Sequence, residues 1–130
     1  NLLDIFSDCS SLKTAPIIPQ NVTELGDGAF GWNPNLETVT LNNGLTYIGR
    51  QAIFACPKLT TLTVPASVTK IDSAAFACCD YLTSLVFEDT TGWYLEDWDE
   101  TLTPIDSAIL NNPESALQFY NENSGIWIKK

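Results

Sequence analysis

Four cysteines are the residues of this chain with the most distinctive potential chemistry. Cys78 and Cys79 are adjacent, and Cys56 precedes them in the chain. A metal site, a disulfide, a reactive thiol and a purely structural role are all open at this point. The chain contains no histidine, so it lacks the commonest general base and metal ligand. A serine or cysteine nucleophile would have no imidazole partner, and we therefore expect no enzyme activity.

A second candidate for chemistry is an acidic stretch that contains no basic residue. Carboxylate oxygens suit calcium, but the EF-hand spacing with its central glycine is absent. A pair of carboxylates for glycoside hydrolysis would need a cleft, which nothing in the sequence indicates. We interpret the stretch as a solvated loop and leave calcium binding open. Its carboxylates are Glu88, Asp89, Glu96, Asp97, Asp99, Glu100 and Asp106.

The overall charge excludes several classes of partner. Sixteen acidic residues against six basic ones give a net charge of −10. Nucleic acids and anionic membrane surfaces are therefore unfavourable partners, because both are bound through Lys and Arg. No apolar run approaches the roughly 20 residues that span a bilayer, so we expect no membrane insertion. The 130 residues contain no methionine, and we expect them to be one domain cut from a longer protein.

The elements that must position these residues come from an internal repeat. Segments 22–44, 45–67 and 68–90 are equal in length and align without a gap, and the same apolar columns recur in all three. Such a period indicates a repeat architecture in which stacked units share one core. The columns are Val22, Leu45, Val68; Leu25, Ile48, Ile71; Ala29, Ala52, Ala75; Phe30, Ile53, Phe76; Leu36, Leu59, Leu82; Val39, Leu62, Leu85; and Leu41, Val64, Phe87.

Each repeat predicts two short extended pieces and a turn. The "LxxLxL" part alternates with period 2, so that Leu62 and Val64 point inward while Thr61 and Thr63 point outward. The "VTxIG" part is a second extended piece, and "AFxxC" predicts a tight helical or 3₁₀ turn. Parallel crossovers favour a right-handed coil. A partial fourth copy precedes residue 22, with one extra residue in "PIIPQN"; its column residues are Phe6, Cys9, Leu12, Ala15 and Ile17.

The pattern "VTxIGxxAFxxCxxLxxLxVP" resembles the BspA-like leucine-rich repeat over roughly residues 5–90. Asn33, Ile53 and Asp72 depart from that pattern. The resemblance implies a repeat from a surface or secreted bacterial protein, extracellular or on the cell surface, that adheres to a host or neighbouring-cell protein. It implies no catalytic residues and no cofactors. A structural spacer that displays another domain is the alternative function.

The resemblance also implies a role for the cysteines. Cys9, Cys56 and Cys79 share one column with Asn33, and the family uses Asn or Cys there to hydrogen-bond the backbone of neighbouring coils. A zinc site is disfavoured because zinc commonly takes paired CxxC units. A Cys56–Cys79 disulfide stays open, because successive rungs lie roughly 4.8 Å apart. We expect Cys78 to be a partly buried thiol without activation.

The outward positions of the strands form the candidate binding face. Repeat proteins often bind through such a surface, although threonine is also simply a good strand former. We expect a protein ligand here and a monomeric chain. The candidate residues are Thr38, Thr40, Asn42, Thr61, Thr63, Ser84, Val86 and Glu88.

The C-terminal segment breaks the period and predicts a cap. "TTGWYL" and "SGIWIKK" are strand-like and could pair. Between them, "NPESALQFYNEN" predicts a helix capped by Asn112, with Pro113 and Glu114 in its first turn and its end at Gly125. We expect Ala116, Leu117 and Tyr120 to face the core, and Trp93 and Trp127 to cover the last rung.

The predicted fold is thus an α/β repeat, a right-handed leucine-rich repeat solenoid with parallel short strands and a C-terminal cap. The array covers residues 1–89, and the capping segment covers residues 90–130. The array contains a partial repeat at 1–21 and full repeats at 22–44, 45–67 and 68–90.

Overall fold

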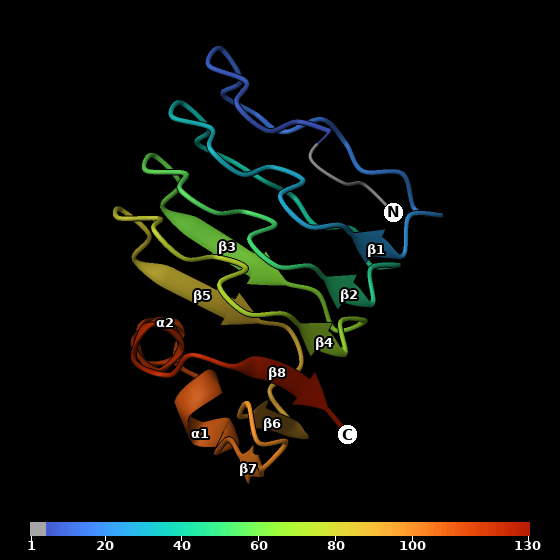
Figure 1. Cartoon of the computed structure of the whole chain (residues 1–130), viewed down its shortest axis with the longest axis vertical. Coiled ribbons are helices and arrows are strands. Elements are labelled where there is room, and N and C mark those ends of the chain that lie inside the picture. Colours follow the sequence, from blue (N-terminus) through green and yellow to red (C-terminus); the bar gives the residue numbers. More distant parts are fainter. Residues whose placement is uncertain (1–4) are drawn as a thin grey trace.

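The computed structural model describes residues 5–130, and it shows the repeats as successive stacked rungs (Figure 1). The "VTxIG" pieces form β1 (Glu24–Leu25), β2 (Tyr47–Ile48) and β4 (Lys70–Ile71), which pair in parallel. Each residue pairs with its equivalent in the next repeat, as Glu24 does with Tyr47 and Tyr47 with Lys70. The predicted period is therefore the register of the sheet.

The "LxxLxL" pieces form a second, two-stranded parallel sheet. It contains β3 (Thr61–Val64) and β5 (Ser84–Phe87), which pair in the same repeat-to-repeat register. Inward and outward side chains alternate along both strands as predicted. In the first full repeat, however, the strand is reduced to an isolated parallel bridge between Thr38 and Thr14. The partial first repeat, which would pair with this strand, contains Pro16, and proline has no N–H to donate to a sheet.

The prediction of a tight turn in each rung is confirmed, with bonds of 3₁₀ spacing such as Ala52 N to Gly49 O at 3.2 Å, but the prediction of helical backbone there was wrong. The turns use left-handed backbone instead, at Gln51 and Ala74 and again at Ala55 (φ 54°, 57° and 55°). Backbone N–H groups in the turn of each rung donate hydrogen bonds to carbonyl groups of the next rung, for example Phe30 N to Ala52 O at 2.7 Å. Bonds between rungs alternate with bonds of three-residue spacing within a rung, such as Gly31 N to Gly28 O at 2.9 Å, and together they satisfy these backbone groups.

The shared apolar columns form one continuous core, and most of their members are buried. Phe6 of the partial copy stacks on Phe30 with ring centroids 5.2 Å apart. The assignment of Ile17 to a core column was wrong, because this side chain is 94% exposed. Ile18 is buried instead, since the extra residue of the first rung shifts it into the column of Leu41.

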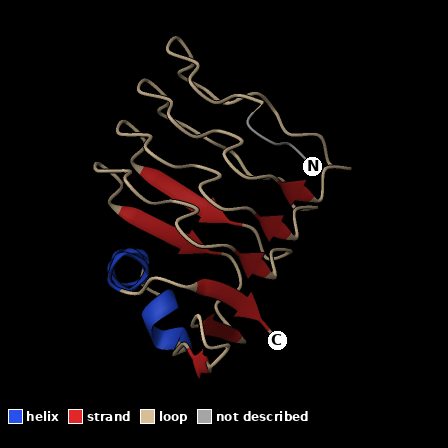
Figure 2. Cartoon of the chain, in the orientation of Figure 1, coloured by secondary structure: helices blue, strands red, loops and turns tan. Residues whose placement is uncertain are grey.

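The C-terminal segment adds three strands and two helices (Figure 2). The central strand is β8 (Ile126–Lys129), which pairs antiparallel with β4 on one side and with β6 (Trp93–Glu96) on the other. The predicted pairing of the two aromatic strands is therefore confirmed. Strand β7 (Leu102–Pro104) forms the outer edge, and α1 (Ser107–Leu110) follows it.

Helix α2 (Pro113–Glu122) packs against β5. The side chain of Asn112 caps its N-terminus, and Ala116, Leu117 and Tyr120 are buried, all as predicted. The predicted end at Gly125 was wrong. The helix ends earlier, at Glu122, and Asn123 Nδ2 donates to Phe119 O at 2.9 Å just beyond it.

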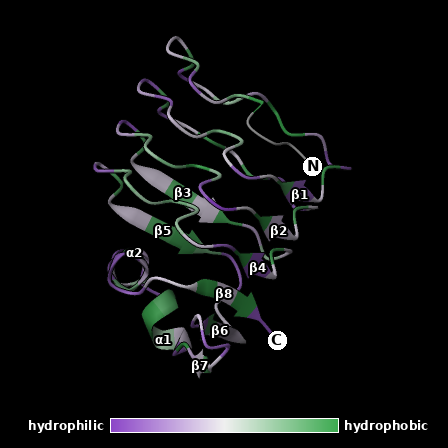
Figure 3. Cartoon of the chain, viewed as in Figure 1, coloured by the Kyte–Doolittle hydropathy of each residue, from purple (hydrophilic) through white to green (hydrophobic). Residues whose placement is uncertain are grey.

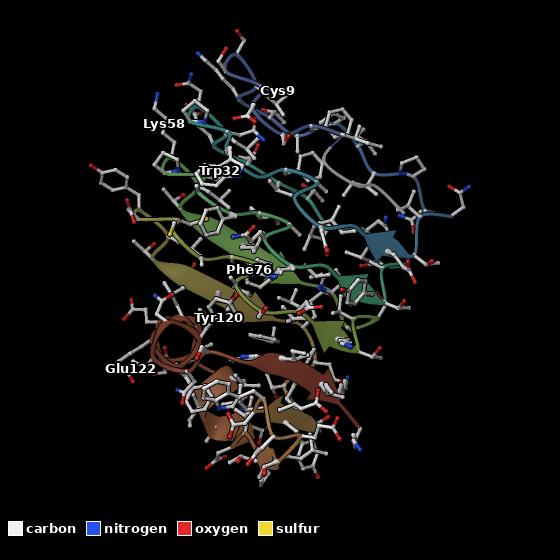
Figure 4. All side chains as sticks on the ribbon, viewed as in Figure 1. Cys9, Trp32, Lys58, Phe76, Tyr120 and Glu122 are labelled. Carbon is white, nitrogen blue, oxygen red and sulfur yellow. The ribbon has the colours of Figure 1, made fainter. Side chains whose placement is uncertain are left out.

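Aromatic side chains join this segment to the last rung. Trp127 is fully buried and stacks on Phe87 with ring centroids 5.6 Å apart, and Trp93 meets Phe87 edge-on at 5.4 Å. The ring of Tyr120 lies 5.3 Å from that of Phe76, and Figure 4 shows the two side chains in neighbouring positions. Figure 3 shows the middle of β8 coloured as hydrophobic. The core therefore continues from the repeats into the C-terminal segment.

Candidate functional site

The column of Asn33 and the cysteines is a hydrogen-bonded ladder inside the turns. Asn33 is fully buried, and its Nδ2 donates to Phe6 O and to Phe30 O, both at 2.7 Å. Its Oδ1 accepts from Cys9 N at 2.9 Å. One amide therefore satisfies backbone groups in two adjacent rungs, which agrees with the structural interpretation of this column.

The buried thiols extend the same ladder. Cys56 Sγ donates to Phe30 O at 3.2 Å, and Cys79 Sγ donates to Ile53 O at 3.1 Å. Both cysteines are free, so the alternative of a disulfide between them is not realised. The contact with the Cys56 thiol, together with burial, raises the pKa of Cys79. We interpret these sulfur atoms as hydrogen-bond donors within the scaffold.

Cys78 differs from its neighbour. Its thiol was predicted to be partly buried, but Cys78 is exposed. The residue adopts a left-handed backbone conformation (φ 59°), which turns its side chain away from the ladder. The adjacent pair therefore has no shared chemistry.

Strands β6 and β7 pair as a hairpin within the acidic stretch, and Asp97, Asp99 and Glu100 lie in the loop between them, where Asp99 and Glu100 are exposed as predicted for a solvated loop. Asp89, Asp99 and Asp106 make separate local contacts. Asp89 forms an ion pair with Lys129, and this ion pair holds the pKa of Asp89 well below its usual range. The side chain of Asp106 caps α1. Within residues 5–130, no three His, Cys, Asp or Glu side chains are grouped as they would be around a metal ion.

The residues predicted to form the binding face differ in their solvent exposure. Thr38, Thr40, Thr61, Thr63 and Glu88 are exposed. Ser84 and Val86 are half-buried. Asn42 contributes little to this surface, because it is mostly buried and its Nδ2 donates to Pro19 O at 3.0 Å. Asn42 lies just beyond the strand position, where the chain already turns toward the next extended piece.

Two hollows lie along this face, and the sequence did not reveal them. The first has a volume of about 590 Å³ and brings Thr40, Thr63 and Glu88 together with exposed Ile17. The second, of about 630 Å³, lies at the other end of the strands between Lys58 and Tyr81. The only signal that could have indicated the first hollow was the irregular "PIIPQN" segment, whose extra residue expels Ile17 from the core.

Parallel rungs at a fixed period, leucine-rich columns and an Asn/Cys ladder together define a leucine-rich repeat protein. The chain belongs to the family described as "BspA type Leucine rich repeat region (6 copies)", whose model matches residues 3–94. Within residues 5–130, no helix has the length and apolar character needed to cross a membrane.

A solved structure agrees with this assignment. The chain is similar to a leucine rich cell surface protein from Faecalibacterium prausnitzii A2-165, with 29% sequence identity and a TM-score of 0.66. The match covers 78% of this chain but only 28% of that protein. No curated protein matches the chain significantly.

Proposed function

We propose that this chain is a non-catalytic protein-binding module of a bacterial cell-surface or secreted leucine-rich repeat protein, acting as a monomer in adhesion to a host or neighbouring-cell protein. The observation that carries the proposal is the strand face. Thr38, Thr40, Thr61 and Thr63 project from it, and the hollow beside Ile17 and Glu88 offers apolar and charged contacts together. The cell-surface description of the solved relative supports the location.

The fold details fit this role. We assign a right-handed coil, because parallel crossovers favour that hand. We assign residues 1–89 to the array, of which residues 1–4 lie outside the described part of the chain, and residues 90–130 to its cap, because β8 pairs with the last short strand β4 and α2 covers β5. An end closed in this way leaves the strand face open to a ligand.

A structural spacer is the second candidate, and one observation favours it. The central positions of the face carry small hydroxyl and aliphatic side chains, whereas binding hot spots are enriched in Trp, Tyr and Arg. A spacer would tolerate any soluble substitution on this face. The two functions therefore differ in one measurable property.

The test compares two triple variants in pull-downs of host-cell surface proteins. Thr38→Lys/Thr61→Lys/Ser84→Lys places three charges on the strand face. Thr23→Lys/Thr46→Lys/Thr69→Lys, at three other exposed positions in the rungs, adds the same charge elsewhere and is the matched control. Loss of a captured protein with the first variant alone supports binding through the strand face. Capture that is equal for both variants contradicts it.

A further inference from the structure

A third hollow lies at the turns, away from the strand face, and we call it the turn groove. It has a volume of about 390 Å³. Its lining combines one large aromatic side chain, small or rigid side chains and two carboxylates. These residues include Asp8, Trp32, Ala55, Pro57, Cys78 and Asp80.

Trp32 is the unusual member of this groove. It occupies a left-handed backbone position (φ 61°), where a bulky side chain is unfavourable. Burial does not compensate, because Trp32 is 51% exposed. Its ring is nevertheless held in place by an edge contact with Phe54, with ring centroids 4.8 Å apart. Residues at the equivalent position of the other rungs share this φ, so the distinctive feature of Trp32 is its half-exposed and fixed aromatic ring, which suits contact with another molecule.

The stacking of the rungs explains the shape of the groove. Asp8, Trp32, Ala55 and Cys78 occupy the same position in four successive rungs, and all four have positive φ. The large ring of Trp32 is followed by two small side chains, which leaves the space beside it open. Figure 4 places Trp32 close to the turns of the rungs.

The negative charge of the groove favours a cationic ligand. Asp8 and Asp80 are exposed at its two ends, and no Lys or Arg contributes to its lining. They lie three rungs apart, which corresponds to roughly 14 Å at the spacing of parallel strands. A single cation therefore cannot pair with both carboxylates, but an extended peptide with two basic residues four positions apart spans roughly the same distance.

We propose that the turn groove binds a basic, arginine-containing segment of a partner protein. One guanidinium stacks on the Trp32 ring and pairs with Asp8, and a second pairs with Asp80. Arginine suits the site better than lysine because its planar, weakly hydrated group stacks on aromatic faces and offers several donors. This inference shares with the proposed function only the assumption that a protein is bound, since it concerns a different surface.

The test is a titration with the capped peptide Arg-Gly-Gly-Gly-Arg, followed through the indole N–H resonances of the four tryptophans. Trp32→Phe assigns the Trp32 signal. We expect this signal to shift, and the neutral citrulline analogue of the peptide to leave it unchanged. Trp32→Ala should weaken binding roughly fivefold, and so should Asp8→Asn/Asp80→Asn.

The chain contains an internal control. Trp98 is completely exposed and stands among Asp97, Asp99 and Glu100, but it does not line the turn groove. Asp97→Asn/Glu100→Gln removes the same charge as the groove variant, and we expect it to change the affinity less than about twofold. Equal shifts of Trp98 and Trp32 would overturn the proposal, because generic attraction would then suffice. A response to the citrulline peptide, or none to the arginine peptide, would also overturn it. None of these outcomes bears on the strand face.

Discussion

Asn33 joins two rungs through a single amide. Its donor and acceptor atoms reach Phe6 O, Phe30 O and Cys9 N, all within the turns. Buried backbone groups are costly when they lack a partner, so this position tolerates only side chains that can hydrogen-bond. The same requirement explains the thiols of Cys56 and Cys79, which donate to backbone carbonyls of the preceding rung.

Replacing Asn33 with alanine should therefore lower the free energy of unfolding by about 2–4 kcal/mol, since several buried backbone groups lose their partner. Asn33→Cys should lower it by less, because the column accepts cysteine in the next two rungs. Denaturant titration of both variants measures the difference. An alanine variant within about 0.5 kcal/mol of the parent would show that the ladder is not stabilising.

The four thiols should differ in reactivity. Cys78 is exposed, whereas Cys56 and Cys79 are buried, and the raised pKa of Cys79 keeps its thiol protonated under mildly alkaline conditions. Only the thiolate is alkylated. Brief treatment of the native protein with iodoacetamide at mildly alkaline pH, followed by peptide mass spectrometry, should label Cys78 well before Cys79. Faster labelling of Cys79 would contradict the buried ladder.

Sequence reasoning at this scale succeeded where a column repeats and failed where one rung departs from the others. The column was predictable because Asn33, Cys56 and Cys79 keep the period, and its hydrogen-bonding role was implied by the family resemblance. Ile17 and Asn42 were misplaced because the extra residue in the first rung and the turn after the strand shift the side chains locally. A repeated column shows which residues are equivalent, but it does not show at which position an extra residue leaves the core.

At the scale of elements, local signals predicted α2 and β8. The cap at Asn112 with Pro113 and the alternating aromatic strand both act within a few residues. The backbone of the turns was mispredicted because its left-handed conformations depend on bonds to the next rung, which no single segment displays. The two hollows on the strand face were invisible for the same reason, because each is formed by several rungs.

Tyr120 links α2 to the last rung, and its removal should be measurable. Its hydroxyl accepts a hydrogen bond from Phe76 N at 3.0 Å. Tyr120→Phe leaves this N–H unpaired and should reduce the free energy of unfolding by about 1–2 kcal/mol at neutral pH. Urea titration with a circular dichroism readout measures the loss, and an unchanged stability would contradict the contact.

The same residue should make stability depend on alkaline pH. Burial raises the pKa of Tyr120 to about 12, above its ordinary value of 10.0. Between these values the phenol ionises in the unfolded chain first, so its contribution to stability is complete below the lower value and is lost as the pH rises toward the higher one. Tyr120→Phe should remove this decline, which amounts to about 3 kcal/mol once the pH exceeds the higher value. The free energy of unfolding, measured against pH for the parent and for Tyr120→Phe, tests this prediction. Identical slopes for the two proteins between pH 10 and 12 would contradict it.

At the scale of the whole molecule, no rung can bury its apolar face alone. The rungs and the C-terminal segment share one core, from Phe6 on Phe30 at one end to Phe87 on Trp127 at the other. Stability is thus a property of the stack, and the outward threonines lie outside its core. A stack with a repeated exposed face is the arrangement on which the proposed binding function depends.

The most direct test of that function is the affinity for a protein captured from the host-cell surface. It is measured by surface plasmon resonance for the parent and for the two triple lysine variants. We predict that Thr38→Lys/Thr61→Lys/Ser84→Lys weakens binding at least about tenfold, while Thr23→Lys/Thr46→Lys/Thr69→Lys changes it less than about twofold. Equal affinities of the two variants would contradict binding through the strand face.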